Sequence, residues 1–470
     1  MTLPPTNRTS LRRSVSDLGR DGLGAFRDRS GDVALAATLA GSNIWGGAGP
    51  AAGKRVLLAI EDQLASALCL MALDGVASQI VLCPPDLTEA HRVVIARRVG
   101  VDLVVTDHAD GFTPGLEDIQ HLRCGPNVEK ANENAVPAAL TDWVLLTSGT
   151  SGPPKAVRHT LATLTGAIGP AAASAAAVVW STFYDIRRYG GLQIFLRAVL
   201  GGHSLVLSHH DEPVVDFLAR AGAAGATHIT GTPSHWRSAL MTGSIGSIAP
   251  QYVRLSGEIA GQVVLDGLKA AFPAARPVHA FASTEAGVAF EVTDGLEGFP
   301  AGYVGDDDAP VAMRVVEGSL RIRSARAAFD YVGEAGEALK DVGGFVDTGD
   351  MVELRNGRYY FTGRRGGIIN VGGAKVHPEE VEAVINRHPS VQVSLVKARS
   401  NPIMGAIVAA EIVLKGEPAA TRTPEDLDAL RSDITALCQS ALAAHKVPLS
   451  LRFVAKLPLT AAGKLVRSNA

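Results

Sequence analysis

The chain of 470 residues has few charged residues, few cysteines and no long apolar run. Charged residues make up 19% of it and the formal net charge is −3, which gives no electrostatic reason to expect nucleic acid or an anionic membrane as the main partner. No apolar run reaches the roughly 18–20 residues that span a bilayer. The four cysteines are not spaced like metal ligands, which favours reduced thiols and a cytoplasmic location.

The N-terminal segment also lacks the features of a targeting signal. Residues 1–29 are rich in Arg and Ser but contain no hydrophobic core, and three aspartates argue against a transit peptide. A stretch rich in Gly, Ala and Pro follows over residues 42–53 and reads as a loop. We therefore expect residues 1–54 to form a leader and a loop.

Beyond residue 55 short apolar runs alternate with helical patterns. Strands are expected over 55–60, 79–83 and 103–106, and helices over 63–75 and 89–99. This order predicts parallel strands with right-handed crossovers. No Gly-x-Gly-x-x-Gly follows the first strand, so the pattern favours one sheet of a larger α/β domain over a dinucleotide-binding fold.

The pattern becomes rich in strands from residue 318, and Asn356-Gly357 predicts a tight hairpin. We interpret the Gly- and Arg-rich stretch 362–367 as a hinge between two domains. After it, helices are expected from 378 and over 424–444, with strands over 391–397, 407–413 and 450–454. The predicted fold class is α/β, with a large N-terminal domain of mixed and parallel sheets plus a strand-rich subdomain (55–363), and a small mobile α+β C-terminal domain (364–470).

The most informative segment runs from Leu145 to Lys155 and reads Leu-Leu-Thr-Ser-Gly-Thr-Ser-Gly-Pro-Pro-Lys. Glycines let backbone N–H groups approach an anion, while hydroxyls and a lysine add donors and positive charge, so the segment predicts a phosphate-binding loop. The spacing is not that of a Walker loop, because the Gly-Lys-Ser/Thr ending is missing. This difference disfavours a Walker-type NTPase.

Further motifs follow in a fixed order along the chain. They are Phe281-Ala-Ser-Thr-Glu285, Asp347-Thr-Gly-Asp350, Gly363-Arg-Arg365 and Pro458-Leu-Thr-Ala-Ala-Gly-Lys464-Leu-Val-Arg467. With the phosphate-binding loop, they make the chain resemble the adenylate-forming superfamily, which contains acyl- and aryl-CoA synthetases, nonribosomal peptide adenylation domains and firefly luciferase. The resemblance runs from about Arg55 to the end and is weakest before Thr141.

This resemblance implies an acid–thiol ligase that forms an acyl adenylate from ATP and a carboxylic acid, releases pyrophosphate, and then makes a thioester with CoA. ATP, Mg²⁺ and coenzyme A are the implied cofactors, and a small carboxylic acid is the implied substrate. The residues that match the nucleotide-binding segments of the superfamily are Thr147, Ser148, Gly149, Thr150, Ser151, Gly152, Lys155, Ser256, Gly257, Glu258, Phe281, Ala282, Ser283, Asp350 and Arg364.

The resemblance also implies individual roles. Phe281 would stack near adenine, Thr284 would lie near the α-phosphate and Glu285 would bind Mg²⁺. Asp350 would accept hydrogen bonds from both ribose hydroxyls, and Arg364 would also reach the ribose.

Lys464 is the principal predicted catalytic residue, together with Thr284 and Glu285. A flexible tip that carries Lys464 can bring an ammonium group between the carboxylate and the α-phosphate. Gly372 and Gly373 match the segment that builds the pantetheine tunnel, where the absence of side chains leaves room for a thin thiol arm.

The pocket for the acid is expected to draw on segments 180–189, 230–233, 255–258 and 280–282. Phe183, Tyr184 and Trp236 are either walls of this pocket or core residues. No charged residue clearly marks an amino-acid substrate, although Asp185 lies near the position where relatives bind an α-amine.

Two alternatives to the CoA ligase stay open at this point. One is an enzyme that adenylates an acid and loads it on the phosphopantetheine of an acyl carrier protein. The other is a nucleotide-binding regulator without catalysis, which Gly366-Gly367 at the usual Asp or Lys hinge position makes conceivable. The sequence also leaves a homodimer open and does not name the acid.

Overall fold

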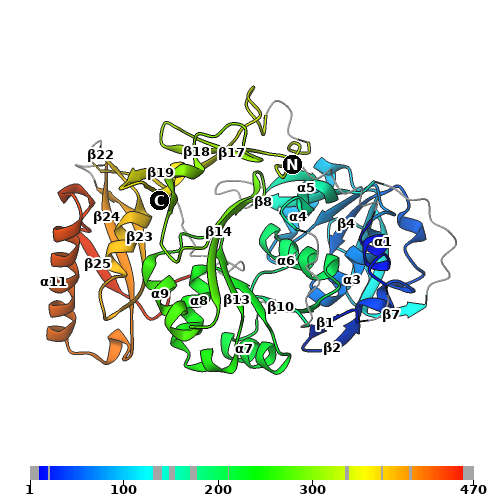
Figure 1. Cartoon of the computed structure of the whole chain (residues 1–470), viewed down its shortest axis with the longest axis horizontal. Coiled ribbons are helices and arrows are strands. Elements are labelled where there is room, and N and C mark those ends of the chain that lie inside the picture. The colour runs from blue at the N-terminus through cyan, green and yellow to red at the C-terminus, as the bar shows by residue number, and fades with distance from the viewer. Residues whose placement is uncertain are drawn as a thin grey trace.

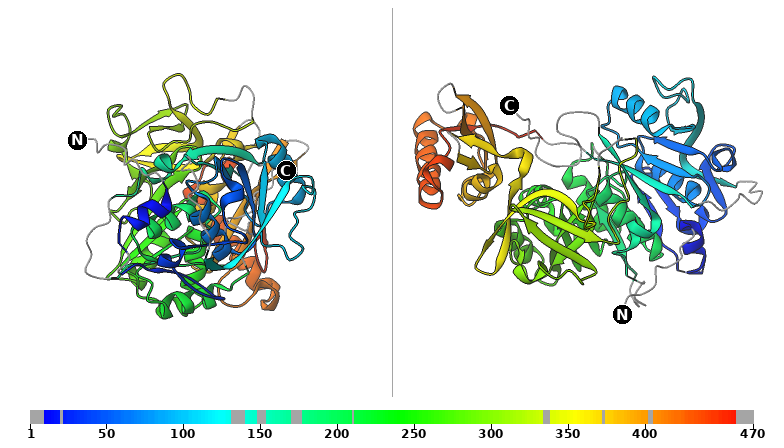
Figure 2. Two further views of the ribbon diagram at one scale, coloured as in Figure 1. Left: turned by 90° about the vertical axis from the view of Figure 1, so that its right-hand side faces the viewer. Right: turned by 90° about the horizontal axis from the view of Figure 1, so that it is seen from above.

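The structure is a computed structural model that describes residues 10–19, 22–130, 140–147, 154–169, 177–209, 211–333, 338–371, 374–401 and 405–458 (Figure 1). Two large sheets lie side by side, and a five-stranded sheet packs beside them. The C-terminal elements form a separate body at the end of the molecule opposite the sheet that contains β4 (Figure 2). In the described part of the chain, no helix combines the length and the apolar character needed to cross a membrane.

The first large sheet has seven strands in the order β3-β7-β6-β4-β5-β8-β9. Its central strands β4, β5, β6 and β8 are parallel, as the alternation of strands and helices predicts. Its elements are β3 (Gly41–Ile44), β4 (Arg55–Ala59), α3 (Gln63–Leu73), β5 (Gln79–Leu82), α4 (Glu89–Val99), β6 (Leu103–Thr106), β7 (Gln120–Lys130), β8 (Asp142–Thr147) and β9 (Lys155–Thr160). All five elements predicted between residues 55 and 106 are thereby confirmed.

The second large sheet has eight strands in the order β15-β14-β13-β12-β10-β11-β1-β2. Helix α6 covers one face and α7, α8 and α9 cover the other (Figure 1). Its elements are β1 (Ala25–Asp28), β2 (Gly31–Ala34), β10 (Val179–Thr182), α6 (Tyr189–Leu200), β11 (Ser204–Val206), α7 (Val214–Ala223), β12 (His228–Gly231), α8 (Pro233–Met241), β13 (Tyr252–Ser256), α9 (Gln262–Ala271), β14 (Arg276–Ser283) and β15 (Gly287–Val292).

The N-terminal residues differ from the expected leader and loop. Strand β1 pairs in parallel with β11, and Phe26 is fully buried against Phe195, with ring centroids 5.7 Å apart. Helix α1 (Leu11–Ser16) buries Leu11, whose backbone N–H donates to the Asp74 carboxylate over 2.7 Å. The expectation of a leader and loop was therefore wrong for these described residues. The few apolar side chains that hold the segment in the core are separated by polar ones, so the sequence shows no clear strand or helix pattern there.

A five-stranded antiparallel sheet forms the strand-rich subdomain, in the order β16-β20-β19-β18-β17. Its strands are β16 (Phe299–Pro300), β17 (Val311–Val316), β18 (Ser319–Ser324), β19 (Val346–Arg355) and β20 (Arg358–Arg364). The predicted hairpin is confirmed, since Asn356 and Gly357 connect β19 to β20 with φ angles of 49° and 76°.

The C-terminal body packs helices on a three-stranded sheet, β23-β24-β25. Its elements are β21 (Ile369–Val371), β22 (Ala374–Val376), α10 (Pro378–Ile385), β23 (Val391–Asn401), β24 (Gly405–Leu414), α11 (Pro424–Ala441) and β25 (Ser450–Phe453). The helices and strands predicted after residue 378 are confirmed, and so is the α/β class with a large N-terminal and a small α+β C-terminal part. Helix α10 contacts β20, which brings this body next to the strand that carries Arg364.

Candidate active site

The predicted phosphate-binding loop connects two paired strands. Strand β8 ends at Thr147 and β9 begins at Lys155, and these two residues are antiparallel partners at the open end of the hairpin. The pairing fixes both ends of the loop. Ser148, Gly149, Thr150, Ser151 and Gly152 lie outside the described residues, so their predicted role is untested.

Lys155 is held at the base of this loop by an aromatic ring. Its Nζ lies 4.9 Å from the centroid of the Tyr331 ring, a distance at which a cation is attracted to the ring face. Val157 of the same strand forms an isolated antiparallel bridge with Tyr331. The lysine therefore keeps a defined place where the loop returns to the sheet.

The segment from Phe281 to Glu285 forms the end of β14 and the turn into β15. Ser283 Oγ accepts a hydrogen bond from the Ala286 backbone N–H over 3.0 Å, and the Glu285 carbonyl accepts one from the Ala328 N–H over 2.9 Å. Gly287 adopts a φ of 76°, which lets the chain reverse directly after Glu285. These bonds fix the position of Thr284 and Glu285 at the edge of the eight-stranded sheet.

His159 ties this turn to the strand that leaves the phosphate-binding loop. It is fully buried, and its Nε2 donates to the Thr284 carbonyl over 2.7 Å. Its Nδ1 lies 2.9 Å from Thr163 Oγ1. Burial lowers the pKa of His159 to about 4, so the ring is neutral at physiological pH. The sequence analysis missed this residue, because a lone histidine in a strand carries no recognisable motif.

Asp350 and Arg364 face each other across β19 and β20. They are register partners, and Arg364 Nε lies 2.9 Å from Asp350 Oδ1. Burial lowers the pKa of Arg364, but the charge and hydrogen bond of Asp350 outweigh it, with further contributions from Glu285 and Glu379, and raise the pKa overall. The two residues predicted to bind the ribose therefore lie next to each other and form an ion pair.

Glu285 connects this pair to the phosphate-binding hairpin. Burial raises the pKa of Glu285, the negative charge of Asp350 raises it further, and the positive charges of Arg364 and Lys155 oppose the shift. The charges of Asp350, Arg364 and Lys155 thus all act on the Glu285 carboxylate. Chain segments separated by more than two hundred residues thus form one cluster of two carboxylates and two cations.

Neighbouring charged residues have structural partners. Asp347 accepts a hydrogen bond from Ser319 Oγ over 2.6 Å and from the Gly349 N–H over 3.0 Å. Arg365 Nη1 lies 3.2 Å from Asp347. Both residues therefore stabilise the strand and turn beside the cluster.

The Ser256-Gly257-Glu258 loop is fixed by hydrogen bonds to two other elements. The Tyr184 hydroxyl donates to the Ser256 carbonyl over 2.8 Å. The Glu258 carboxylate accepts hydrogen bonds from the backbone N–H and the hydroxyl of Ser234, at 2.9 and 3.1 Å, in the first turn of α8. Glu258 thus caps a helix, and its predicted contact with nucleotide is untested.

Phe281 lies in an aromatic stack that joins two sheets. Its ring is 5.3 Å from Phe361 of β20 and 5.7 Å from Phe290 of β15, with interplanar angles of 8° and 16°. The stack fixes the five-stranded sheet against the end of β14. The predicted contact of Phe281 with adenine is untested.

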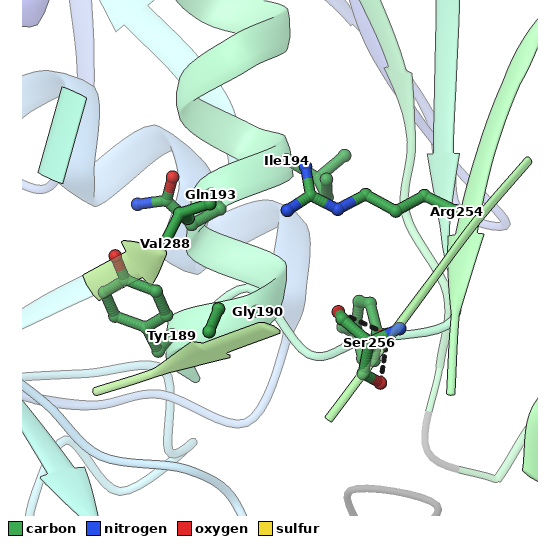
Figure 3. A pocket seen from close by; sticks show the side chains of 9 residues that line it. Tyr189, Gly190, Gln193, Ile194, Arg254, Ser256 and Val288 are labelled. Atoms are coloured by element: carbon green, nitrogen blue, oxygen red, sulfur yellow. Dashed lines mark hydrogen bonds between the residues drawn. The ribbon is translucent and has the colours of Figure 1, made fainter. Parts of the chain in front are cut away.

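A small cavity of about 10 Å³, with room for about one water molecule, lies between α6 and the face of the eight-stranded sheet. Arg254 reaches across it, and its guanidinium lies beside Ile194 of α6 (Figure 3). The residues that line the pocket are Tyr184, Tyr189, Gly190, Gln193, Ile194, Arg254, Ser256, Ala282 and Val288. Of the Phe281–Glu285 segment, Ala282 lines this cavity.

The predicted acid pocket is only partly the observed one. Tyr184 lines the cavity. Trp236 of α8 is instead fully buried in the hydrophobic core that α8 shares with α9, and Phe183 packs on Phe217 and His235. Asp185 is buried and paired with Arg187 over 2.6 Å, so it is occupied by a structural partner. The sequence analysis missed Arg254, although an arginine inside the apolar strand Tyr252–Ser256 was a usable signal.

Several predicted residues cannot be placed. Gly372, Gly373 and Lys464 lie outside the described residues. Strands β21 and β22 are described on both sides of the two glycines and pair with each other. No group of three or more His, Cys, Asp or Glu residues suited to a metal occurs among the residues described.

Two family models match this chain. The model described as AMP-binding enzyme matches residues 36–325, and the AMP-binding enzyme C-terminal domain matches residues 380–464. The chain belongs to the AMP-binding enzyme family. The predicted resemblance to adenylate-forming enzymes is thereby confirmed.

Curated relatives of this AMP-binding enzyme match parts of it. The mitochondrial acyl-coenzyme A synthetase ACSM5 of Rattus norvegicus is 34% identical over 133 residues, which is 28% of this chain and 22% of the relative. The 2-succinylbenzoate–CoA ligase of Listeria monocytogenes serotype 4b (strain F2365) is 26% identical over 355 residues, 71% of this chain and 72% of the relative. The match to the first relative thus spans only about a fifth of its length.

Solved structures share the fold over nearly the whole chain. The anthranilate CoA ligase AuaEII in complex with anthranoyl-AMP has a TM-score of 0.78 at 18% identity, covering 97% of this chain and 95% of that chain. The o-succinylbenzoate CoA synthetase MenE from Bacillus subtilis, in complex with ATP and magnesium ion, has a TM-score of 0.77 at 20% identity, with coverage of 97% and 98%. At these identities the likeness shows a common fold.

Proposed function

We propose that this AMP-binding enzyme activates a carboxylic acid with ATP and transfers the acyl group to CoA. The observation that carries this proposal is the Asp350–Arg364 ion pair, whose charges act together with that of Lys155, at the open end of the phosphate-binding hairpin, on Glu285. The names of relatives support it, since they include an acyl-coenzyme A synthetase and a 2-succinylbenzoate–CoA ligase.

In the first step a carboxylate oxygen attacks the α-phosphorus of ATP, the bond from this phosphorus to the bridging oxygen breaks, and pyrophosphate leaves with the electron pair. Two anions must meet, so positive charge is needed around them. Lys155 at the loop base and Arg364 beside the ribose position supply such charge, and Lys464 is proposed to add it between the reacting groups.

Glu285 and Asp350 fit a nucleotide that carries a metal ion. A carboxylate oxygen is a ligand that Mg²⁺ prefers, and Glu285 is held near the phosphate-binding hairpin. When bound, Mg²⁺ neutralises charge on the phosphate oxygens. Asp350 is proposed to accept hydrogen bonds from the ribose, with Arg364 holding its carboxylate in place.

In the second step the CoA sulfur attacks the acyl carbon, the bond from this carbon to the AMP oxygen breaks, and the thiol proton passes to solvent. Gly372 and Gly373 are proposed to leave room for the pantetheine arm. Phosphopantetheine on an acyl carrier protein is the alternative acceptor, and turnover with free CoA alone distinguishes the two.

Three broader predictions also stay proposals. The domain division at residues 363 and 364 is supported by the family matches on either side of it, although β1 to β3 extend the large domain toward the N-terminus. A cytoplasmic location is supported by four buried free cysteines. A homodimer would be recognised by its mass in light scattering.

The test is product analysis on a panel of carboxylic acids, with ATP, Mg²⁺ and CoA present or absent. We expect AMP and pyrophosphate to appear only with a suitable acid, and an acyl-CoA of the matching mass to appear when CoA is added. Adenylate without thioester would favour the carrier-protein acceptor. Bound ATP with no acid-dependent product would contradict the proposal and favour a nucleotide-binding regulator.

A further inference from the structure

Residues 326–332 lie against strand β9, the strand that leaves the phosphate-binding loop. Strand β9 is the last strand of its sheet, so its outer edge can pair with a further segment. The Arg158 N–H donates to the Asp330 carbonyl over 3.0 Å, and the Val332 N–H donates to the Ala156 carbonyl over 2.8 Å. Residues 326–332 therefore continue the β8–β9 hairpin as a short third segment.

An ion pair makes a shift of this pairing unfavourable. The Arg158 guanidinium binds both carboxylate oxygens of Asp330, with Nε 2.9 Å from Oδ1. Side chains alternate between the two faces of a strand, so a shift by one residue would turn Asp330 away from Arg158. The pairing therefore has one favoured register.

This register places the Tyr331 ring next to Lys155. Tyr331 is the antiparallel partner of Val157. Lys155 precedes Val157 by two residues on β9, so both side chains leave the strand on the same face. Such diagonal neighbours are within reach of each other when one side chain is long and the other is aromatic. The Lys155 Nζ accordingly lies 4.9 Å from the centroid of the Tyr331 ring.

The same segment is attached at its other end to the turn that carries Glu285. The Ala328 N–H donates to the Glu285 carbonyl over 2.9 Å, and Ala328 is fully buried. A Cβ on Gly287 would lie 2.4 Å from the carbonyl oxygen of Arg326, so the two backbones are in close contact. Because Tyr331 follows Ala328 by three residues, the segment connects the Glu285 turn to the base of the phosphate-binding loop.

We propose that Tyr331 is a positioning residue for ATP binding, whose ring holds the Lys155 ammonium group where it meets the phosphates. This inference rests on the proposed function, in which Lys155 closes the phosphate-binding loop. Ordering a lysine side chain when a ligand binds costs conformational entropy. The ring attracts the ammonium group before ATP arrives and so reduces this cost. An ammonium group has three N–H donors, so contact with one ring face is compatible with phosphate binding.

The experiment measures the Kd of ATP with Mg²⁺ by isothermal titration calorimetry in wild-type protein, Tyr331→Leu, Lys155→Met and the double variant. Tyr331→Leu should raise the Kd about 5-fold, the effect of losing one cation–π contact. Lys155→Met should raise it further, because the charge itself is lost. The double variant should bind ATP no more weakly than Lys155→Met, since the ring then has no cation to hold.

Two further changes separate positioning from folding. Tyr331→Phe keeps the ring and should keep the Kd within about 2-fold of the wild-type value. Adding one, two or three fluorine atoms to that phenylalanine ring keeps its shape but weakens the negative potential of its face. The Kd should then rise with each fluorine, which tests the inference even where Tyr331→Leu does not fold.

Phe329→Leu is the matched control on the same segment. The Phe329 ring is exposed and lies 5.9 Å from Lys340 Nζ, so this change removes a cation–π contact that does not involve Lys155. The Kd of ATP should stay at the wild-type value.

The outcomes distinguish this inference from the proposed function. Losses of affinity that add up in the double variant, or a Kd that does not change with fluorination, would overturn the positioning role and leave acid activation standing. ATP binding is measured without an acid, so an enzyme that binds ATP but activates no acid would count against the proposed function alone. A protein that binds no ATP would overturn both.

Discussion

At the scale of single residues, Glu285 is the member of the charged cluster on which the other three charges act. Its side chain is half-buried, and the charges of Lys155 and Arg364 offset part of the effect of Asp350 on its pKa. Glu285→Gln keeps the shape but removes the charge that would bind Mg²⁺. We expect kcat for pyrophosphate release to fall about 100-fold or more, with a higher Mg²⁺ concentration needed for half-maximal rate. Glu417→Gln, an exposed glutamate of the C-terminal body, is the matched control.

Asp350 allows a prediction that separates binding from chemistry. Its predicted partner is the ribose, which does not react, so Asp350→Asn should raise KM for ATP about 10-fold or more and change kcat much less. Steady-state kinetics at saturating acid measures both constants. A large fall in kcat at unchanged KM would show instead that Asp350 acts on the phosphates.

Asp74 gives a prediction about stability. Burial raises its pKa to about 7, although the Leu11 N–H and the Trp143 Nε1–H donate to its carboxylate and oppose the shift. Between the unfolded-state pKa near 4 and about 7, the folded protein binds more protons than the unfolded chain. The free energy of unfolding should therefore fall as the pH rises through this window, by at most roughly 4 kcal/mol from this group.

Urea unfolding at pH 5 and pH 8 measures this effect, with Asp74→Asn as the comparison. The wild-type protein should lose stability relative to the variant as the pH rises. Parallel behaviour of the two proteins across this range would show that Asp74 titrates at an ordinary pKa in the folded state.

At the scale of secondary-structure elements, His159 couples the phosphate-binding hairpin to the Thr284–Glu285 turn. Removing its hydrogen bond to the Thr284 carbonyl should loosen the turn, so His159→Leu should lower kcat about 10-fold or more while the protein remains folded. His159→Gln offers an amide N–H to the same carbonyl and should restore part of the rate. Equal rates in both variants would contradict a positioning role.

Some secondary-structure elements could be predicted from the sequence and others could not. The strands and helices between residues 55 and 106, the Asn356-Gly357 turn and the C-terminal body followed from periodicity and turn residues, because each is specified locally. The N-terminal strands β1 to β3 did not, since their place depends on pairing with distant strands such as β11 and β7.

The same distinction applies to the site. Glu285, Asp350 and Arg364 were found through motifs, and the structure brings them together with Lys155. Arg254 and Tyr331 were not found, because none of the recognised motifs contains them and their places come from strand pairing. Three-dimensional proximity was thus the information that the sequence lacked.

At the scale of the whole molecule, the cluster lies where the large domain meets the C-terminal body. Gly363 has a φ of 137°, and a Cβ there would collide with the Glu379 carboxylate of α10. Glu379 in turn acts on the charge of Arg364. Gly363→Ala should therefore disturb this contact and reduce overall turnover with CoA, whereas Gly416→Ala, at a positive-φ glycine with open space around it, controls for backbone strain alone.

The most direct test of the central claim is acid-dependent exchange of labelled pyrophosphate into ATP, measured without CoA on the wild-type enzyme and on Glu285→Gln and Lys464→Ala. We expect exchange that requires a carboxylic acid and is strongly reduced in both variants. An enzyme that binds ATP but shows no exchange with any acid, or exchanges equally well in all three forms, would contradict it.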